Sequence, residues 1–191
     1  MKPETTENFL DELILTQPVL DNFSVCTFMC SAAARLGADI CYTATKSSEY
    51  SEANKRLTRI QLQLEHYEKR FTELSEIFKT AAKGIDFSAF GNYEQITELL
   101  IDFLKHTNEI IAMIRTVAEF SDSHHSNEIY TSANLIKSAT ENILYTIKSI
   151  IKKNEAEKPA ENVVYRSKML SEDIFNSANK VFSILQKEDD N

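Results

Sequence analysis

The chain has 191 residues, a formal net charge of −8, and contents of 42% hydrophobic and 26% charged residues. This length suffices for one domain with a sizeable hydrophobic core, and we expect residues 1–191 to form a single domain. Only three glycines and three prolines are present, which disfavours an all-β fold and leaves no glycine-rich loop for phosphate binding. The acidic balance disfavours nucleic acid as a partner, because a phosphate backbone attracts a basic surface.

The first residues, MKPETTENFLDEL, are acidic and lack the basic segment and long apolar run of a signal peptide. The chain also has an odd number of cysteines, three in all, which does not suit a disulfide framework. We therefore expect a cytoplasmic protein whose thiols are reduced.

Apolar residues recur three and four positions apart along most of the chain, which is the spacing of one face of a helix. The pattern predicts an all-α fold, an antiparallel bundle of about five long helices plus a short N-terminal helix. Short polar connections between long helices favour antiparallel neighbours. The expected helices span residues 5–16, 19–46, 51–82, 93–120, 127–153 and 160–187.

No glycine or proline separates the second expected helix from the third, so one continuous rod is an alternative. The apolar stripe of the third helix, extended backwards, would place Asp39 and Lys46 on the buried face. The segment KSSEYSE also supplies residues that cap helices well. We therefore expect a turn at residues 46–51.

Residues 24–44, SVCTFMCSAAARLGADICYTA, are rich in apolar residues and raise the question of a membrane span. Only 13 uncharged residues lie between Asp21 and Arg35, whereas a span requires about 20 predominantly apolar ones. We therefore expect no membrane span.

The same stretch contains all three cysteines, Cys26, Cys30 and Cys41. On a helix they share a narrow face with the small residues Ala33 and Gly37. A free cysteine behaves as a small hydrophobic residue, so we expect a central helix against which its neighbours pack closely. A metal site is the weaker interpretation, because zinc requires four ligands and Cys41 lies about 16 Å further along the helix than Cys30. We expect no cofactor.

Phe28, Arg35 and Tyr42 lie on the otherwise polar side of this helix. Two explanations are open for the aromatic side chains. We favour the first, in which the short helix at 5–16 folds over them. In the second they form an exposed patch for a partner, which is the best candidate for partner binding in the sequence.

Two histidines are candidates for chemistry. His106 occupies a core position of its expected helix, where we expect a buried histidine that hydrogen-bonds across the bundle. His66 lies off the apolar stripe and has Lys69 three residues later. An exposed histidine with a lysine at this spacing resembles histidine phosphotransfer domains, which would make His66 a phosphoacceptor, but Arg70 stands where those domains have glycine.

The sequence contains none of the catalytic motifs HExxH, CxxCH or GxSxG, and no Glu-x-x-His pair of a di-iron bundle. We therefore expect a non-enzymatic bundle, a protein–protein interaction or scaffold module that binds another protein or self-associates through a helix face. The alternative is a sensor or regulatory bundle with a small apolar ligand, metal or haem in its core near the cysteines and His106. A more remote alternative is histidine phosphotransfer at His66.

Overall fold

The computed structural model describes residues 18–47, 52–82, 93–121, 123–153 and 160–189. In this part of the chain there are five long α-helices, one short 3-10 helix and no strand. The prediction of an all-α antiparallel bundle with five long helices is thereby confirmed, and the short helix expected at 5–16 lies outside the described residues. The elements are α2 (Pro18–Ser47), α3 (Glu52–Ala82), α4 (Tyr93–Phe120), η2 (Ser123–His125), α5 (Ser126–Lys153) and α6 (Ala160–Asp189).

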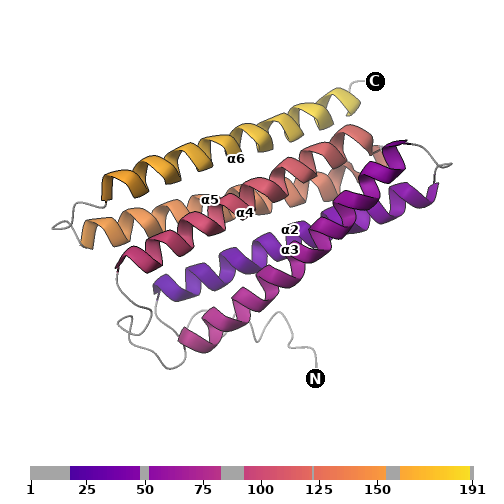
Figure 1. Cartoon of the computed structure of the whole chain (residues 1–191). Coiled ribbons are helices and arrows are strands. Elements are labelled where there is room, and N and C mark those ends of the chain that lie inside the picture. The colour runs from indigo at the N-terminus through magenta and orange to yellow at the C-terminus, as the bar shows by residue number, and fades with distance from the viewer. Residues whose placement is uncertain (1–17, 48–51, 83–92, 122, 154–159, 190–191) are drawn as a thin grey trace.

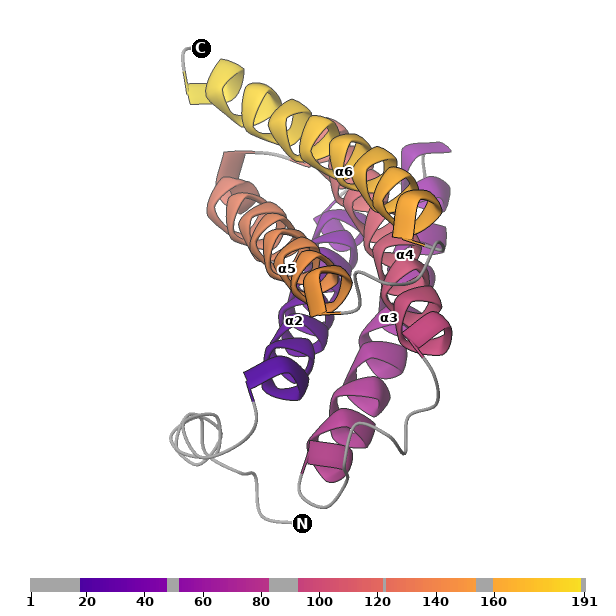
Figure 2. The ribbon, with the colours of Figure 1, turned by 90° about the vertical axis from the view of Figure 1, so that its left-hand side faces the viewer.

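Successive helices run in opposite directions along the bundle (Figure 1). α2 and α3 are separate helices that lie side by side and share the most extensive contact of the fold, so they do not form one continuous rod. α2 also packs against α5 and α4, while α6 lies on the other side of the α4–α5 pair (Figure 2). α2 therefore packs against three of the other four long helices, and its contact with α3 is the most extensive.

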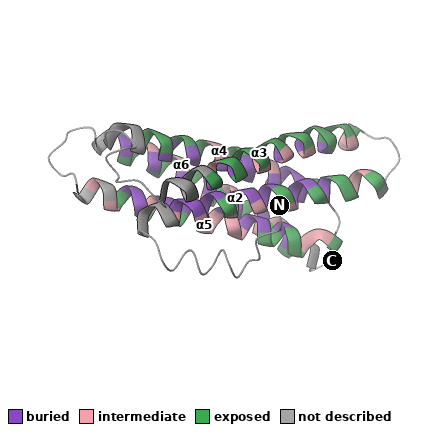
Figure 3. Cartoon of the chain, turned by 90° about the horizontal axis from the view of Figure 1, so that it is seen from below, coloured by how far each residue is buried: buried purple, intermediate pink, exposed green. Residues whose placement is uncertain are grey.

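Each helix has an apolar face turned toward its neighbours and a polar face turned outward (Figure 3). The isoleucines of α4 and α5 dominate the largest fully buried side chains. All three cysteines of α2 are free and completely buried. None of the described helices contains an apolar run sufficient to span a bilayer.

The close packing around α2 depends on its small residues. A Cβ atom added at Gly37 would lie 2.9 Å from Leu64 Cδ1 and still closer to Ile114 Cδ1. Between α2 and α3 the contacts are made partly by hydroxyl groups, because Ser31 Oγ hydrogen-bonds Thr72 Oγ1 at 2.8 Å and Ser24 Oγ lies 3.2 Å from Ser75 Oγ. Such short side chains allow the two backbones to approach closely where these residues meet.

Candidate functional site

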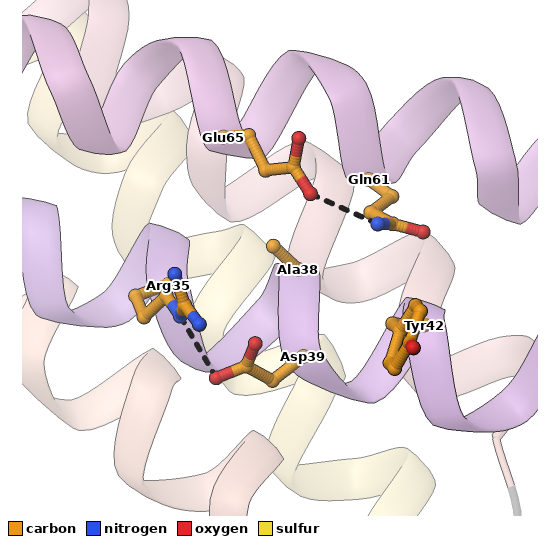
Figure 4. Close-up of a pocket in the computed structure, with 6 residues that line it drawn as sticks. All are labelled: Arg35, Ala38, Asp39, Tyr42, Gln61 and Glu65. Carbon is orange, nitrogen blue, oxygen red and sulfur yellow. Dashed lines mark hydrogen bonds and ion pairs between the residues drawn. The ribbon is translucent and has the colours of Figure 1, made fainter.

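A pocket of about 210 Å³ opens on the outer side of the contact between α2 and α3 (Figure 4). The two helices bring their polar faces together there, because side chains three and four positions apart lie on the same side of a helix. α2 contributes four lining residues and α3 contributes two. The lining residues are Arg35, Ala38, Asp39, Tyr42, Gln61 and Glu65.

An ion pair forms one end of the pocket. Arg35 Nε donates a hydrogen bond of 2.9 Å to Asp39 Oδ2, one turn further along α2. Arg35 Nη1 also lies 3.6 Å from Glu68 Oε2 on α3, so the guanidinium is shared by two carboxylates. The hydrogen bond to Asp39, followed by the nearby negative charges of Asp39 and Glu68, raises the pKa of Arg35.

The other end of the pocket has an amide, a carboxylate and an aromatic ring. Gln61 Nε2 donates a hydrogen bond of 2.9 Å to Glu65 Oε1 along α3. The Tyr42 ring faces this pair from α2 (Figure 4). Lys46 Nζ lies 4.1 Å from the centroid of that ring, within the range of a cation–π contact.

The lining offers two carboxylates and a phenol, which are groups that give and accept protons in catalysis. The pocket is open to solvent and has the size of a head group rather than of a whole drug-sized ligand. Its geometry therefore suits a small polar molecule, or the polar end of a larger one.

The three residues of the predicted partner patch have different positions. Arg35 and Tyr42 both line the pocket, whereas Phe28 does not. The side chains of Phe28 and Tyr42 are 50% and 47% exposed. The helix that we favoured as their cover lies outside the described residues. Sequence reasoning did not find the α3 half of the pocket, although Gln61 and Glu65 are spaced four apart on a polar face.

The cysteines lie away from this pocket, in the core. Burial raises the pKa of Cys30 to about 12 and that of Cys41 to about 12, and it raises the pKa of Cys26 as well. Cys30 Sγ lies 3.7 Å from the hydroxyl of Thr107 on α4. Within the described ranges, no group of three or more His, Cys, Asp or Glu side chains is arranged to hold a metal ion.

The side chain of His106 is not fully buried, although the sequence predicted it to be. Its side chain is 24% exposed, and its Nδ1 lies 3.5 Å from Glu109 Oε2 on the same helix. The Tyr67 hydroxyl donates to the same carboxylate, and burial, followed by this hydrogen bond, raises the pKa of Tyr67 to about 12. The neighbouring Thr107 takes the fully buried position instead. His106 therefore lies at the rim of the α3–α4 contact, and His66 is exposed.

No protein-family model and no curated protein matches this sequence. Among solved structures, the fold is similar to that of formiminotetrahydrofolate cyclodeaminase from Thermotoga maritima, with a TM-score of 0.81 and 14% sequence identity. The similarity covers 97% of this chain and 98% of that chain.

This finding contradicts the expectation of a non-enzymatic interaction or scaffold module, together with its sensor and phosphotransfer alternatives. That expectation depended on the absence of catalytic motifs, but a helical bundle of the same architecture is the fold of an enzyme. At 14% identity the similarity establishes that this chain has the cyclodeaminase fold.

Proposed function

We propose that this chain is an enzyme that acts on a small nitrogen-containing substrate and releases ammonia during ring closure. The observation that supports the proposal is the full-length similarity to a formiminotetrahydrofolate cyclodeaminase. Because nearly all of both chains is covered, the two proteins share the whole bundle and not only a pair of helices. Formiminotetrahydrofolate is therefore the first substrate to test.

Ring closure with loss of ammonia requires two proton transfers. The attacking nitrogen loses a proton as it bonds to the carbon, and the departing nitrogen gains one as its bond to that carbon breaks. Carboxylates and phenols perform such transfers when they lie within hydrogen-bond reach of the reacting atoms. The α2–α3 pocket contains Asp39, Glu65 and Tyr42 in its lining.

Glu65 is the group that we assign to proton transfer in this pocket. Asp39 already accepts a hydrogen bond from Arg35, whereas Glu65 has no cationic partner among the described residues and receives only the Gln61 amide. The amide holds one carboxylate oxygen in place and leaves the other for a substrate. Arg35 and Gln61 are positioning residues in this account.

The test is an assay for ammonia release from formiminotetrahydrofolate by the purified full chain and two variants. Glu65→Gln preserves shape but removes the carboxylate, and we expect its rate to fall by about a hundredfold or more. Glu141→Gln makes the same charge change at an exposed position of α5 and should retain the full rate. No ammonia release by folded wild-type protein, or equal rates for wild type and Glu65→Gln, would overturn the proposal.

A cytoplasmic location and self-association through a helix face stay predictions for this chain. Of the two explanations for the aromatic side chains on α2, the partner patch places a second copy at Phe28, which is 50% exposed and lies outside the pocket. Light scattering of wild type and Phe28→Ala tests this, since the variant should have the lower mass if the patch is an interface. Equal masses would remove the patch from consideration.

A further inference from the structure

We infer that the α2–α3 pocket recognises its ligand through an organic cation with several N–H donors, such as an amidinium or a guanidinium group. The inference rests on the proposed function, because it specifies the kind of ligand that the same pocket takes. Three independent features of the lining support it: the unused hydrogen-bonding atoms, the balance of charge and the exposed aromatic ring.

The unused hydrogen-bonding atoms are mainly acceptors. Arg35 Nε donates to one oxygen of Asp39, and Gln61 Nε2 donates to one oxygen of Glu65. Three acceptors thus have no partner in the described part of the chain: the second oxygen of Asp39, the second oxygen of Glu65 and the carbonyl oxygen of Gln61. A ligand that satisfies them must supply donors, and amidinium and guanidinium groups carry several in one plane.

The charge around the pocket is negative. The guanidinium of Arg35 is shared between Asp39 and Glu68, at 2.9 Å and 3.6 Å. Glu65 lines the same pocket without a cation of its own among the described residues. Asp39 and Glu68 therefore share one guanidinium, and Glu65 adds a further negative charge at the pocket. A ligand that brings a positive charge lowers the repulsion between these carboxylates.

Tyr42 provides a surface on which a flat cation can lie. Its ring is 47% exposed and already has the Lys46 ammonium at 4.1 Å from its centroid. A ring face attracts cations through its quadrupole, and the position of Lys46 shows that this ring is accessible to one. Lys46 adds positive charge beside the pocket, so it opposes the binding of a second cation.

The probe for this inference is benzamidinium, with benzamide as its neutral counterpart of the same shape. Titration of the full chain, followed by calorimetry, should show that benzamidinium binds at least about tenfold more tightly than benzamide, as expected for a charge-assisted contact. Glu65→Gln should weaken benzamidinium binding about fivefold, the effect of one partly exposed charge contact. Glu141→Gln should leave the affinity unchanged.

A second variant separates ligand binding from any loss of structure. Lys46→Gln removes the competing positive charge and should strengthen benzamidinium binding about twofold. A change that merely disturbed α2 would weaken it. Equal affinities for benzamidinium and benzamide, no detectable binding, or an unchanged affinity in Glu65→Gln would each overturn the inference.

The two proposals fail in different ways. If benzamidinium binds as described but formiminotetrahydrofolate releases no ammonia, the proposed function fails and the cation pocket stands. If ammonia is released in a Glu65-dependent manner but benzamidinium binds no better than benzamide, the inference about the cation fails and the proposed enzymatic function is retained.

Discussion

Ser132 Oγ on α5 donates a buried hydrogen bond of 2.9 Å to the backbone carbonyl oxygen of Ala33 on α2. The two residues are 99 positions apart in the sequence, and both are fully buried. The bond joins α2 to α5 at a point where small side chains let their backbones approach. It fixes the helix that carries four of the six pocket residues.

We expect Ser132→Ala to lower the free energy of unfolding by about 1 kcal/mol, the net contribution of one buried hydrogen bond. Urea denaturation followed by circular dichroism measures the loss. Ser183→Ala is a suitable control, because its hydroxyl donates only to Asn179 of its own helix and is exposed to solvent. Equal stabilities for the two variants would contradict the assigned role of Ser132.

Gly37→Ala should destabilise the fold by about 1–3 kcal/mol, since a methyl group there would overlap the side chains of Leu64 and Ile114. The helix propensity of alanine opposes this loss by up to about 1 kcal/mol. A thermal melt of the variant tests the balance. A variant as stable as wild type would contradict this prediction and show that the ends of the Leu64 and Ile114 side chains move aside without loss.

Alkaline pH should unfold the protein through its buried thiols. Burial raises the pKa of Cys30 from 9.0 to about 12 in the folded state, so the folded chain keeps a proton that the unfolded chain releases. The resulting stability is complete below pH 9 and is lost as the pH rises toward 12. The urea midpoint at pH 10.5 should therefore be lower than the midpoint at pH 8. This difference should be smaller in Cys30→Ala than in wild type. A steeper decline in the variant would contradict this account.

The same burial predicts slow reaction of the thiols. The thiolate is the reactive form, and desolvation disfavours it at all three cysteines. Native protein at pH 7.5 should react with a bulky maleimide only at the rate of unfolding, whereas protein in urea should react at once. Rapid labelling of the native chain would show that α2 is not an interior helix.

Tyr42→Leu should weaken benzamidinium binding about two- to fivefold, because it removes the ring and its cation–π contact. Tyr42 is about half exposed, so the change should leave the melting temperature within about 1 °C. Tyr145→Leu, at an exposed tyrosine of α5, is the matched control. A similar effect of both substitutions would mean that Tyr42 does not contact the ligand.

The fold class could be predicted from the sequence because apolar spacing reports directly on helix faces. The positions of Leu57, Ile60, Leu64 and Phe71 on α3 follow one stripe, and all four are buried. The small face of α2 was also recognisable, since cysteine, alanine and glycine recur there at helical spacing. These signals are local, and each depends on one helix alone.

The pocket could not be predicted in the same way because it belongs to two helices. Arg35 and Tyr42 were noticed as unusual residues on a polar side, but nothing in the sequence states which part of α3 lies opposite them. Only the pairing of α2 with α3 brings Gln61 and Glu65 to the same pocket. The prediction that His106 is buried was wrong because the buried face of α4 is offset by one residue at this turn. Thr107 points inward there instead of His106.

The expectation of a non-enzymatic module was wrong because the absence of catalytic sequence motifs was taken as evidence against an enzyme. Motifs such as HExxH encode chemistry within one helix, whereas a site assembled from single residues on separate helices leaves no such pattern. A long helical bundle can therefore carry an active site that a linear search does not find.

The most direct test of the central claim is whether benzamidinium competes with formiminotetrahydrofolate. If the α2–α3 pocket is the site of catalysis, benzamidinium should inhibit ammonia release competitively, with an inhibition constant equal to its calorimetric dissociation constant. Glu65→Gln should weaken that dissociation constant. Benzamidinium that occupies the pocket at saturating concentration while ammonia release continues at its full rate would contradict the account.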